Sequence, residues 1–185
     1  MELTLTLPAE TLVPDLETAA GITAFALEDC VREHLRRKNN GTQQRDGFPK
    51  TNYYAKASND VTGTSSGAVA TVTVGGVPGI ALHYYGGTVL PKPGKKALAI
   101  PISPTVAGIW PSEASGFATG GSDDEGLYAM IWPKGSDHGF IKDTETGDLL
   151  WKLVPKATIP ADPTVLPTDD EMLGAANEAI WEAYS

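Results

Sequence analysis

The residue patterns that could carry catalysis are few, and each has a simpler structural interpretation. Residues 63–67 read Gly-Thr-Ser-Ser-Gly and fit the letters of the G-x-S-x-G nucleophile elbow. That motif places its serine on a strained turn from a strand into a helix, whereas this pentapeptide precedes a strand pattern. Residues 143–148 begin like a calcium loop, but Asp148 and Val154 stand where such a loop needs glycine and glutamate. We therefore expect a flexible turn at residues 63–67 and a polar hairpin turn at residues 143–148.

Metal-ligating residue types are scattered along the chain. His34, His83 and His138 are far apart in the sequence, and no pair has the i,i+4 spacing of a zinc-binding helix. Cys30 is the single cysteine and falls inside a helical pattern, so we expect a small core residue in a reducing compartment. His34 is expected at a helix terminus, and His83 as a partly buried hydrogen-bonding residue. The sequence thus predicts no catalytic residue, no metal and no cofactor.

The four tryptophans could supply stacking platforms for sugars or single-stranded nucleic acid. Trp132 and Trp151 fall inside strand patterns, where a large apolar ring is most simply part of the core. Trp110 and Trp181 are better candidates for a contact surface. A β-rich carbohydrate-binding module or a small hydrolase stays open as an alternative function. A concave pocket lined by Trp110, Trp132 and acidic side chains would support that alternative.

The elements that would position these residues begin with a strand and a long helix. Residues 2–7 alternate between polar and apolar, which is typical of a strand. Asp15 is a suitable N-cap for a helix in which apolar residues recur at helical spacing until Asn39, Asn40 and Gly41 end it. The final helix is predicted by Thr168 and Glu171, which have the spacing of a capping box.

Strand patterns dominate the middle of the chain. A short helix is expected within residues 51–61, strands at 68–74 and 97–102, and three strands of an antiparallel meander from Leu127 onward. The predicted fold is a single α+β domain over residues 1–185, an antiparallel sheet or meander with a helix at each end and long flexible loops. Its parts are an N-terminal strand and helix (2–40), a β-rich body (66–155), a proline-rich connector (155–167) and a C-terminal helix (168–184).

Two segments are expected to be mobile in the isolated chain, residues 39–50 and 103–126. Both are long, rich in glycine and poor in apolar side chains, so they cannot offset roughly 1–2 kcal/mol of backbone entropy per ordered residue. Loops of this length usually carry a function or order on contact with a partner.

The charge distribution excludes some partners and favours others. The formal net charge of −9 argues against a protein that coats nucleic acid with its whole surface. No apolar run approaches the 18 or so residues that cross a bilayer, so we expect neither membrane insertion nor secretion. Acidic side chains without basic ones occupy residues 1–31 and 160–185, while residues 32–56 are mostly basic. Opposite blocks of this kind can meet across an interface between copies of one chain.

The terminal helix offers an apolar contribution to such an interface. Trp181 and Tyr184 lie off the face that carries Leu173, Ala176, Ile180 and Ala183, and aromatic residues are enriched at interface centres. The candidate interface residues are Arg32, Arg36, Arg37, Lys38, Arg45, Lys50, Trp110, Trp181 and Tyr184.

Residues 30 to about 110 contain a succession of short motifs around basic, aromatic and glycine residues. They are Lys50, Thr51, Tyr53 and Tyr54; then Gly79, Ile80, Ala81, Tyr84 or Tyr85, Gly86 and Gly87; and finally Pro91, Lys92, Lys96, Leu98, Ile100 and Pro101. In these motifs the chain resembles the phage virion morphogenesis, or tail-completion, family. The resemblance extends more loosely to the meander and the terminal helix, and residues 103–126 have no counterpart in it.

The resemblance implies a structural protein and no enzyme. It implies a subunit of the virion at the head–tail junction, a neck, tail-completion or tail-terminator ring that acts in tail assembly and head–tail joining. The implied partners are further copies of the chain and neighbouring neck and tail proteins, with DNA only as cargo passing through the lumen and no membrane. The chain would then assemble in the host cytoplasm, and residues 79–87 would form a short helical turn entering a glycine bend. A phage-encoded inhibitor of a host protein is a further alternative.

Overall fold

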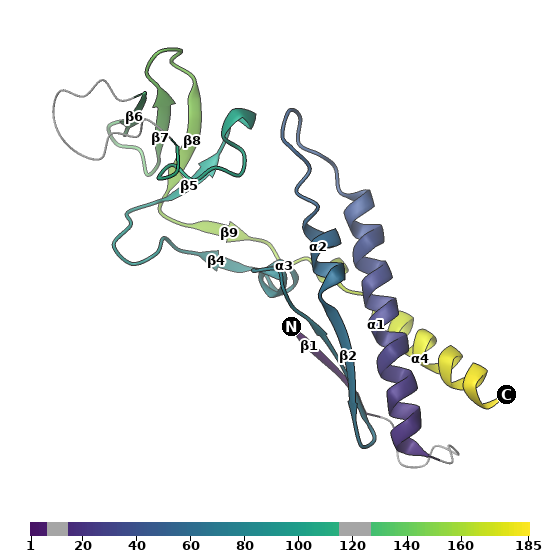
Figure 1. Ribbon diagram of the computed structural model, residues 1–185. Coiled ribbons are helices and arrows are strands. Elements are labelled where there is room, and N and C mark those ends of the chain that lie inside the picture. The colour runs from purple at the N-terminus through teal and green to yellow at the C-terminus, as the bar shows by residue number, and fades with distance from the viewer. Residues whose placement is uncertain (7–14, 115–126) are drawn as a thin grey trace. The chain divides into compact units, whose positions relative to one another are not determined.

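The computed structural model describes residues 1–6, 15–114 and 127–185, which form an α+β fold. The described chain divides into two compact units (Figure 1). Unit 1 is built from Met1–Gln43, Thr51–Gly87 and Pro160–Ser185, and unit 2 from Gln44–Lys50 and Thr88–Ile159. The sequence did not indicate this division. A compact unit need not fold independently, so the single domain stays a prediction.

The described residues of unit 1 form a three-stranded antiparallel sheet, two long helices and two short ones. The sheet has the order β1-β3-β2, and Leu3 on β1 stands opposite Val72 on β3. Its elements are β1 (Glu2–Thr6), α1 (Leu16–Gly41), α2 (Tyr53–Asn59), β2 (Val61–Ser66), β3 (Val69–Val74), α3 (Ile80–Tyr85), the 3₁₀ turn η2 (Pro163–Val165) and α4 (Asp169–Tyr184).

Helix α1 begins and ends where the sequence predicts. The Asp15 side chain accepts a hydrogen bond from the Glu17 backbone N–H, which caps the helix as expected. Buried residues recur along α1 every three or four positions, so one face of the helix is turned toward the core. That face consists of Ala19, Ala20, Thr23, Ala24, Leu27, Val31, Leu35 and Asn39.

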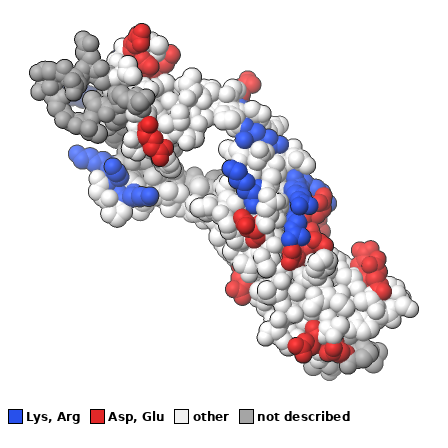
Figure 2. Space-filling view, in the orientation of Figure 1, with Lys and Arg blue, Asp and Glu red and all other residues white. Residues whose placement is uncertain are grey.

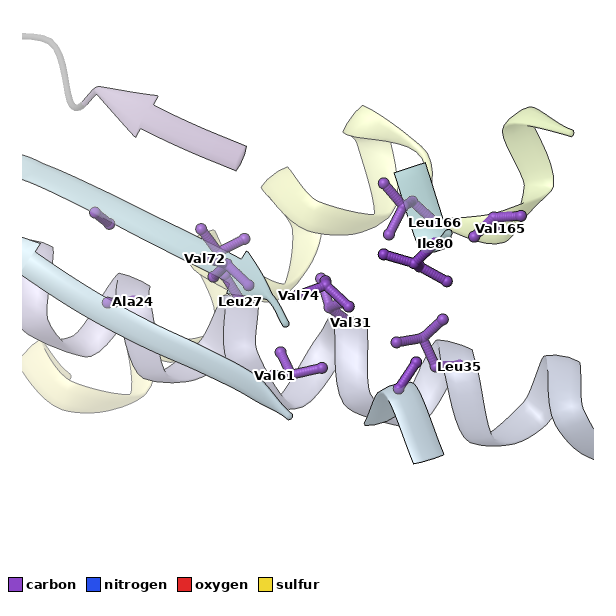
Figure 3. Close-up of a cluster of buried hydrophobic side chains, with 12 residues drawn as sticks. Ala24, Leu27, Val31, Leu35, Val61, Val72, Val74, Ile80, Val165 and Leu166 are labelled. Atoms are coloured by element: carbon purple, nitrogen blue, oxygen red, sulfur yellow. The ribbon is translucent and has the colours of Figure 1, made fainter. Parts of the chain in front are cut away.

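The core of unit 1 forms where this face of α1 meets the sheet and the returning chain. Figure 3 shows side chains of α1, β2 and β3 pointing toward one another, with Val165 and Leu166 contributed from far along the chain. Met172 of α4 packs against the same cluster. The buried members are Ala24, Leu27, Val31, Leu35, Ala57, Val61, Ala70, Val72, Val74, Ile80, Val165 and Leu166.

The Gly-Thr-Ser-Ser-Gly segment is part of a strand, so the expected flexible turn is wrong. Four of its five residues lie in β2, and Gly67 makes the turn into β3. The reason is the packing of β2 on α1: a Cβ at Gly63 would collide with the carbonyl oxygen of Ala24. The Gly63 N–H also donates to Oε2 of Glu28 at 2.7 Å, and this bond lowers the pKa of Glu28.

Helices α3 and α4 lie where they were expected, α3 from the resemblance and α4 from its capping box. The short helix at Ile80–Tyr85 ends at Gly86, whose φ of 71° favours glycine, and this confirms the helical turn implied by the resemblance. Thr168 and Glu171 form the predicted capping box at the start of α4. The proline-rich connector is less uniform than expected, because it contains strand β9 and turn η2.

Unit 2 contains the predicted meander. Strands β6, β7 and β8 pair in succession and antiparallel, and β5 joins the free edge of β8 to give the order β5-β8-β7-β6. A second, two-stranded sheet pairs β4 with β9. The elements are β4 (Gly87–Val89, beginning at the unit boundary), β5 (Leu98–Pro101), η1 (Pro104–Val106), β6 (Tyr128–Ile131), β7 (Gly139–Asp143), β8 (Leu149–Val154) and β9 (Ala157–Ile159).

Of the two tryptophans expected in the core of unit 2, one is buried and the other is exposed. Trp151 is fully buried and stands in edge-to-face contact with Tyr128, as a core residue should. Trp132 is 47% exposed, so its core assignment is wrong. It follows the last residue of β6 and covers Gly139, while its Nε1–H donates to the Ser136 carbonyl at 3.1 Å. Trp132 therefore braces the β6–β7 turn from outside the core.

The two segments expected to be mobile are described in part. Residues 39–41 belong to α1, and Arg45 lies over the ring of Phe48 at 4.2 Å in the segment that follows. Residues 104–106 form η1, whereas residues 115–126 lie outside the described part of the chain. Mobility of the two segments stays a prediction. In the part of the chain that the structure describes, no helix is both long and apolar enough to span a membrane.

Candidate functional site

The basic residues of α1 are held to different degrees by partners within unit 1. Arg32 forms ion pairs with Glu28 and, at 2.9 Å, with Asp29. Its Nη2 also donates to the Val61 carbonyl at 3.4 Å, which ties α1 to β2. Arg36 is exposed and has no ion pair among the residues described. Figure 2 shows blue side chains gathered over the C-terminal half of α1, with red ones among them.

Lys38 is occupied by a partner far along the chain. Its Nζ lies 2.9 Å from Oδ2 of Asp162 and 2.7 Å from Oγ1 of Thr164, and it stands over the ring of Tyr54 at 5.5 Å. Hydrogen bonds from Thr164 and from Lys38 lower the pKa of Asp162 to about 2. Lys38 is thus a structural tether between α1 and η2, and little of its charge is left for another molecule.

The predicted basic block is divided between the units. Arg32, Arg36, Arg37 and Lys38 belong to unit 1, whereas Arg45 and Lys50 belong to the Gln44–Lys50 segment of unit 2. The charge of Arg37 contributes to a lowered pKa of Glu171, after the larger effect of the Thr168 hydrogen bonds. Within unit 1, Arg36 and Arg37 are the two exposed cations of α1.

Helix α4 presents an exposed stripe of large apolar side chains, which we call the aromatic stripe: Leu173, Trp181 and Tyr184. Trp181 is 76% exposed, Leu173 44% and Tyr184 43%. The spacing of eight and three residues places them along one side of the helix. Trp181 and Tyr184 are therefore surface residues of the chain, and Trp181 is not part of its core.

The face of α4 that packs on the core differs from the one expected. Ala176 is buried and Met172 packs on the core, but Leu173 and Ala183 of the predicted face are exposed. The difference arises because α4 contributes to the core mainly through its first turns.

Cys30 was expected to be a core residue, but it is only half-buried. It faces α4, with its Sγ 4.0 Å from the Glu171 carbonyl oxygen.

Trp110, the remaining aromatic candidate, is exposed in unit 2. Its backbone N–H donates to Oε2 of Glu113 at 3.3 Å, within a turn that follows η1. Neither pocket described below is lined by Trp110 or Trp132. No described pocket thus shows the tryptophan arrangement that would support a carbohydrate site.

Asp143 and the three histidines, which were considered as candidate metal ligands or catalytic residues, contact other residues of the fold. Oδ1 of Asp143 accepts hydrogen bonds from the N–H groups of Glu145 and Thr146, which confirms the polar hairpin turn. His34 lies 3.0 Å from the Thr164 carbonyl, although it sits two turns before the end of α1. His83 is half-buried, with its ring 4.8 Å from that of Tyr53, and its backbone carbonyl accepts a bond from Asp162. His138 pairs with Asp137 at 2.8 Å.

Within the described ranges, no three His, Cys, Asp or Glu side chains lie where they could hold a metal ion together. The expected absence of a metal and of catalytic activity stays a prediction.

Two of the pockets formed by the described residues lie in unit 1. One, of about 520 Å³, is lined by α2 and the β3–α3 turn, with Lys56 and Asp60 among its polar residues. The other, of about 310 Å³, lies between β1, β3, α1 and the start of α4, and Leu173 of the aromatic stripe lines it. The aromatic stripe therefore begins at an apolar hollow beside the sheet and continues to the C-terminal end of α4.

Three comparisons, with protein-family models, with curated proteins and with solved structures, found no match for this chain.

Proposed function

We propose that the chain is a structural subunit of a phage virion at the head–tail junction, a neck, tail-completion or tail-terminator protein that works as a homo-oligomeric ring. The short motifs between residues 50 and 101 suggest this class of protein. The observation that carries the proposal is the aromatic stripe on α4. Trp181 is 76% exposed, and burying its apolar surface at an interface would lower the free energy of the assembled protein.

The position of the stripe suits assembly. The face of α4 that carries Met172 and Ala176 anchors the helix on the core, so the stripe can be covered without unfolding unit 1. Exposed aromatic residues of this kind commonly form the centre of an interface, surrounded by polar residues that exclude water. Acidic side chains without basic ones accompany the stripe along α4. The stripe and its charges suit a neighbour that offers apolar and basic groups.

The first experiment measures mass and shape. Light scattering coupled to size-exclusion chromatography should give a molar mass several times that of the 19.5 kDa chain, and negative-stain images should show rings. A chain that stays monomeric up to high micromolar concentration would speak against self-assembly. Virion placement requires its own experiment: antibodies against the chain, carrying gold, should label purified particles between head and tail. Label along the capsid surface, or none at all, would contradict the proposed location.

A further inference from the structure

A turn in unit 2 carries three lysines that have no ion pair among the residues described. We call Lys92, Lys95 and Lys96 the lysine turn. All three are exposed, and the stretch from residue 61 to residue 112 contains no acidic side chain that could neutralise them. Leu90, two residues before the turn, is 66% exposed. The segment thus joins concentrated positive charge to an uncovered apolar side chain.

The lysine turn is also held in shape before any partner arrives. The Lys95 N–H donates to the Lys92 carbonyl at 2.9 Å, and Gly94 takes a φ of 81° at the apex. Pro91 and Pro93 restrict the backbone further. Little conformational entropy of the backbone remains to be lost when such a turn binds, which favours its use as a docking element.

The opposite properties occur at the end of α4. Glu178 and Glu182 are exposed and have no ion pair in the described part of the chain. They are four residues apart on α4, a spacing at which like charges repel, and Trp181 lies three residues after Glu178. The C-terminal end of a helix already carries partial negative charge, and the last turn of α4 has no basic residue to offset it. We call Glu178 and Glu182 the acidic end. Cations from another molecule would relieve the repulsion among these two carboxylates and the negative end of the helix.

We propose that the lysine turn of one copy docks on the acidic end of α4 of the next copy, with Leu90 against Trp181. This inference rests on the proposed function and names the surfaces through which the ring forms. The lysine turn and the acidic end are complementary both in charge and in exposed apolar surface, and every copy carries one of each. A contact between two different surfaces is heterologous, so it repeats from copy to copy and can close a ring.

The other cations account less well for the acidic end. Arg32 and Lys38 are held by carboxylates of their own unit. Arg36 and Arg37 are exposed, but Glu33 lies one turn before both of them on α1. Together the two arginines bring two positive charges to a surface that already holds an acidic side chain, whereas the lysine turn brings three charges with no acidic residue near it in the sequence.

A charge exchange tests this contact in the full-length protein. At about 50 mM salt, Lys95→Glu with Lys96→Glu should raise the concentration needed for half-assembly about tenfold, and so should Glu178→Lys with Glu182→Lys. Combining all four substitutions should restore assembly to within about threefold of the original chain, because the two charges then meet with their signs exchanged. Lys134→Glu with Lys156→Glu, which makes the same change of charge elsewhere in unit 2, should leave assembly unaltered.

The outcomes separate this contact from the proposed function. If both reversals weaken assembly and their combination fails to restore it, the pairing of the two surfaces is wrong. Unchanged assembly in either reversal would overturn it as well, and so would restoration when Arg36→Glu replaces the lysine substitutions. Rings that depend on Trp181 but ignore these exchanges would leave the ring proposal standing. A chain that never assembles under any condition contradicts both. Thermal melts of each variant establish that it is folded.

Discussion

Lys38 of α1 and Asp162 of the chain returning to unit 1 form an ion pair of 2.9 Å between residues 124 positions apart in the sequence. Oδ1 of Asp162 accepts hydrogen bonds from the backbone N–H and the hydroxyl of Thr164, and its backbone N–H donates to the His83 carbonyl. One carboxylate thus caps η2 and fixes η2 on the long helix.

We predict that Asp162→Asn separates these two roles. Asparagine can still cap η2 but has no charge for Lys38, so the free energy of unfolding should fall by about 0.5–1 kcal/mol at pH 7, given that the pair is partly exposed. Asp162→Ala should lose about 1 kcal/mol more. Urea unfolding followed by circular dichroism measures both. An Asp162→Asn variant as stable as the original chain would mean that the charge contributes nothing, and equal losses in the two variants would mean that the cap contributes nothing.

The Asp162 carboxylate, which accepts hydrogen bonds from Thr164 and from Lys38, should make stability depend on pH in acid. The pKa of Asp162 is about 2 in the folded chain against an ordinary 3.8, so its contribution is complete above pH 3.8 and disappears as the pH falls through about 2. The difference in unfolding free energy between the original chain and Asp162→Asn should therefore shrink between pH 4 and pH 2. A difference that stays constant over this range would show that the ion pair is not its source.

Gly63→Ala should destabilise unit 1 substantially. The added Cβ would meet the Ala24 backbone, which cannot move without shifting α1, so we expect a loss of roughly 2 kcal/mol or more. Gly41→Ala is the matched control, because a Cβ there meets nothing and the residue ends a helix. Melting temperatures should fall for the first variant and stay level or rise for the second. Similar melting temperatures for the two variants would mean that β2 can move away from α1 without loss of stability.

Trp181→Ala should weaken assembly and leave the folded chain intact. Removing an aromatic side chain from the centre of an interface commonly costs about 2 kcal/mol or more, which is about a 30-fold increase in the concentration required. Phe25→Ala removes a similarly exposed ring, 66% exposed on the outer face of α1, and serves as the control. Sedimentation velocity reports assembly and a thermal melt reports folding. Loss of the cooperative melt in monomeric Trp181→Ala would assign the tryptophan a role in folding.

Assembly should also weaken as salt is added, because charges farther apart than about 8 Å are largely screened at physiological ionic strength. Reversing Arg36 and Arg37, the exposed cations of α1, should change the slope of this dependence if they face acidic surface on a neighbour or partner ring. Light scattering at several salt concentrations, on the original chain and on Arg36→Glu with Arg37→Glu, gives the two slopes. Parallel slopes would exclude these arginines from the interface.

Local signals explain why much of the fold could be predicted from the sequence. The spacing of apolar residues in α1, the cap at Asp15 and the capping box at Thr168 all depend on neighbours within one or two turns. The meander was predictable for the same reason, since its strands are adjacent in the chain and are joined by short turns.

What could not be predicted depends on contacts between distant residues. Gly63 reads as a turn residue until the closeness of Ala24 is known, and Trp132 reads as core until Gly139 is seen to lie beneath it. The pairing of Lys38 with Asp162 leaves no local trace at either residue. In the candidate site, helical spacing made Trp181 a candidate for a contact surface, but only the structure shows that Trp181 is exposed, that Leu173 joins it and that Lys38 is already engaged.

The three chain segments of unit 1 alternate in the sequence with the two of unit 2, and this imposes an order on the folding of unit 1 during synthesis. A ribosome adds about 5–20 residues per second, so α1 and the sheet exist for several seconds before Val165, Leu166 and α4 emerge to close their core. During that interval the aromatic stripe has not yet been made. If copies join through the aromatic stripe as proposed, a truncated product would lack that surface, and only chains translated as far as α4 would enter the ring.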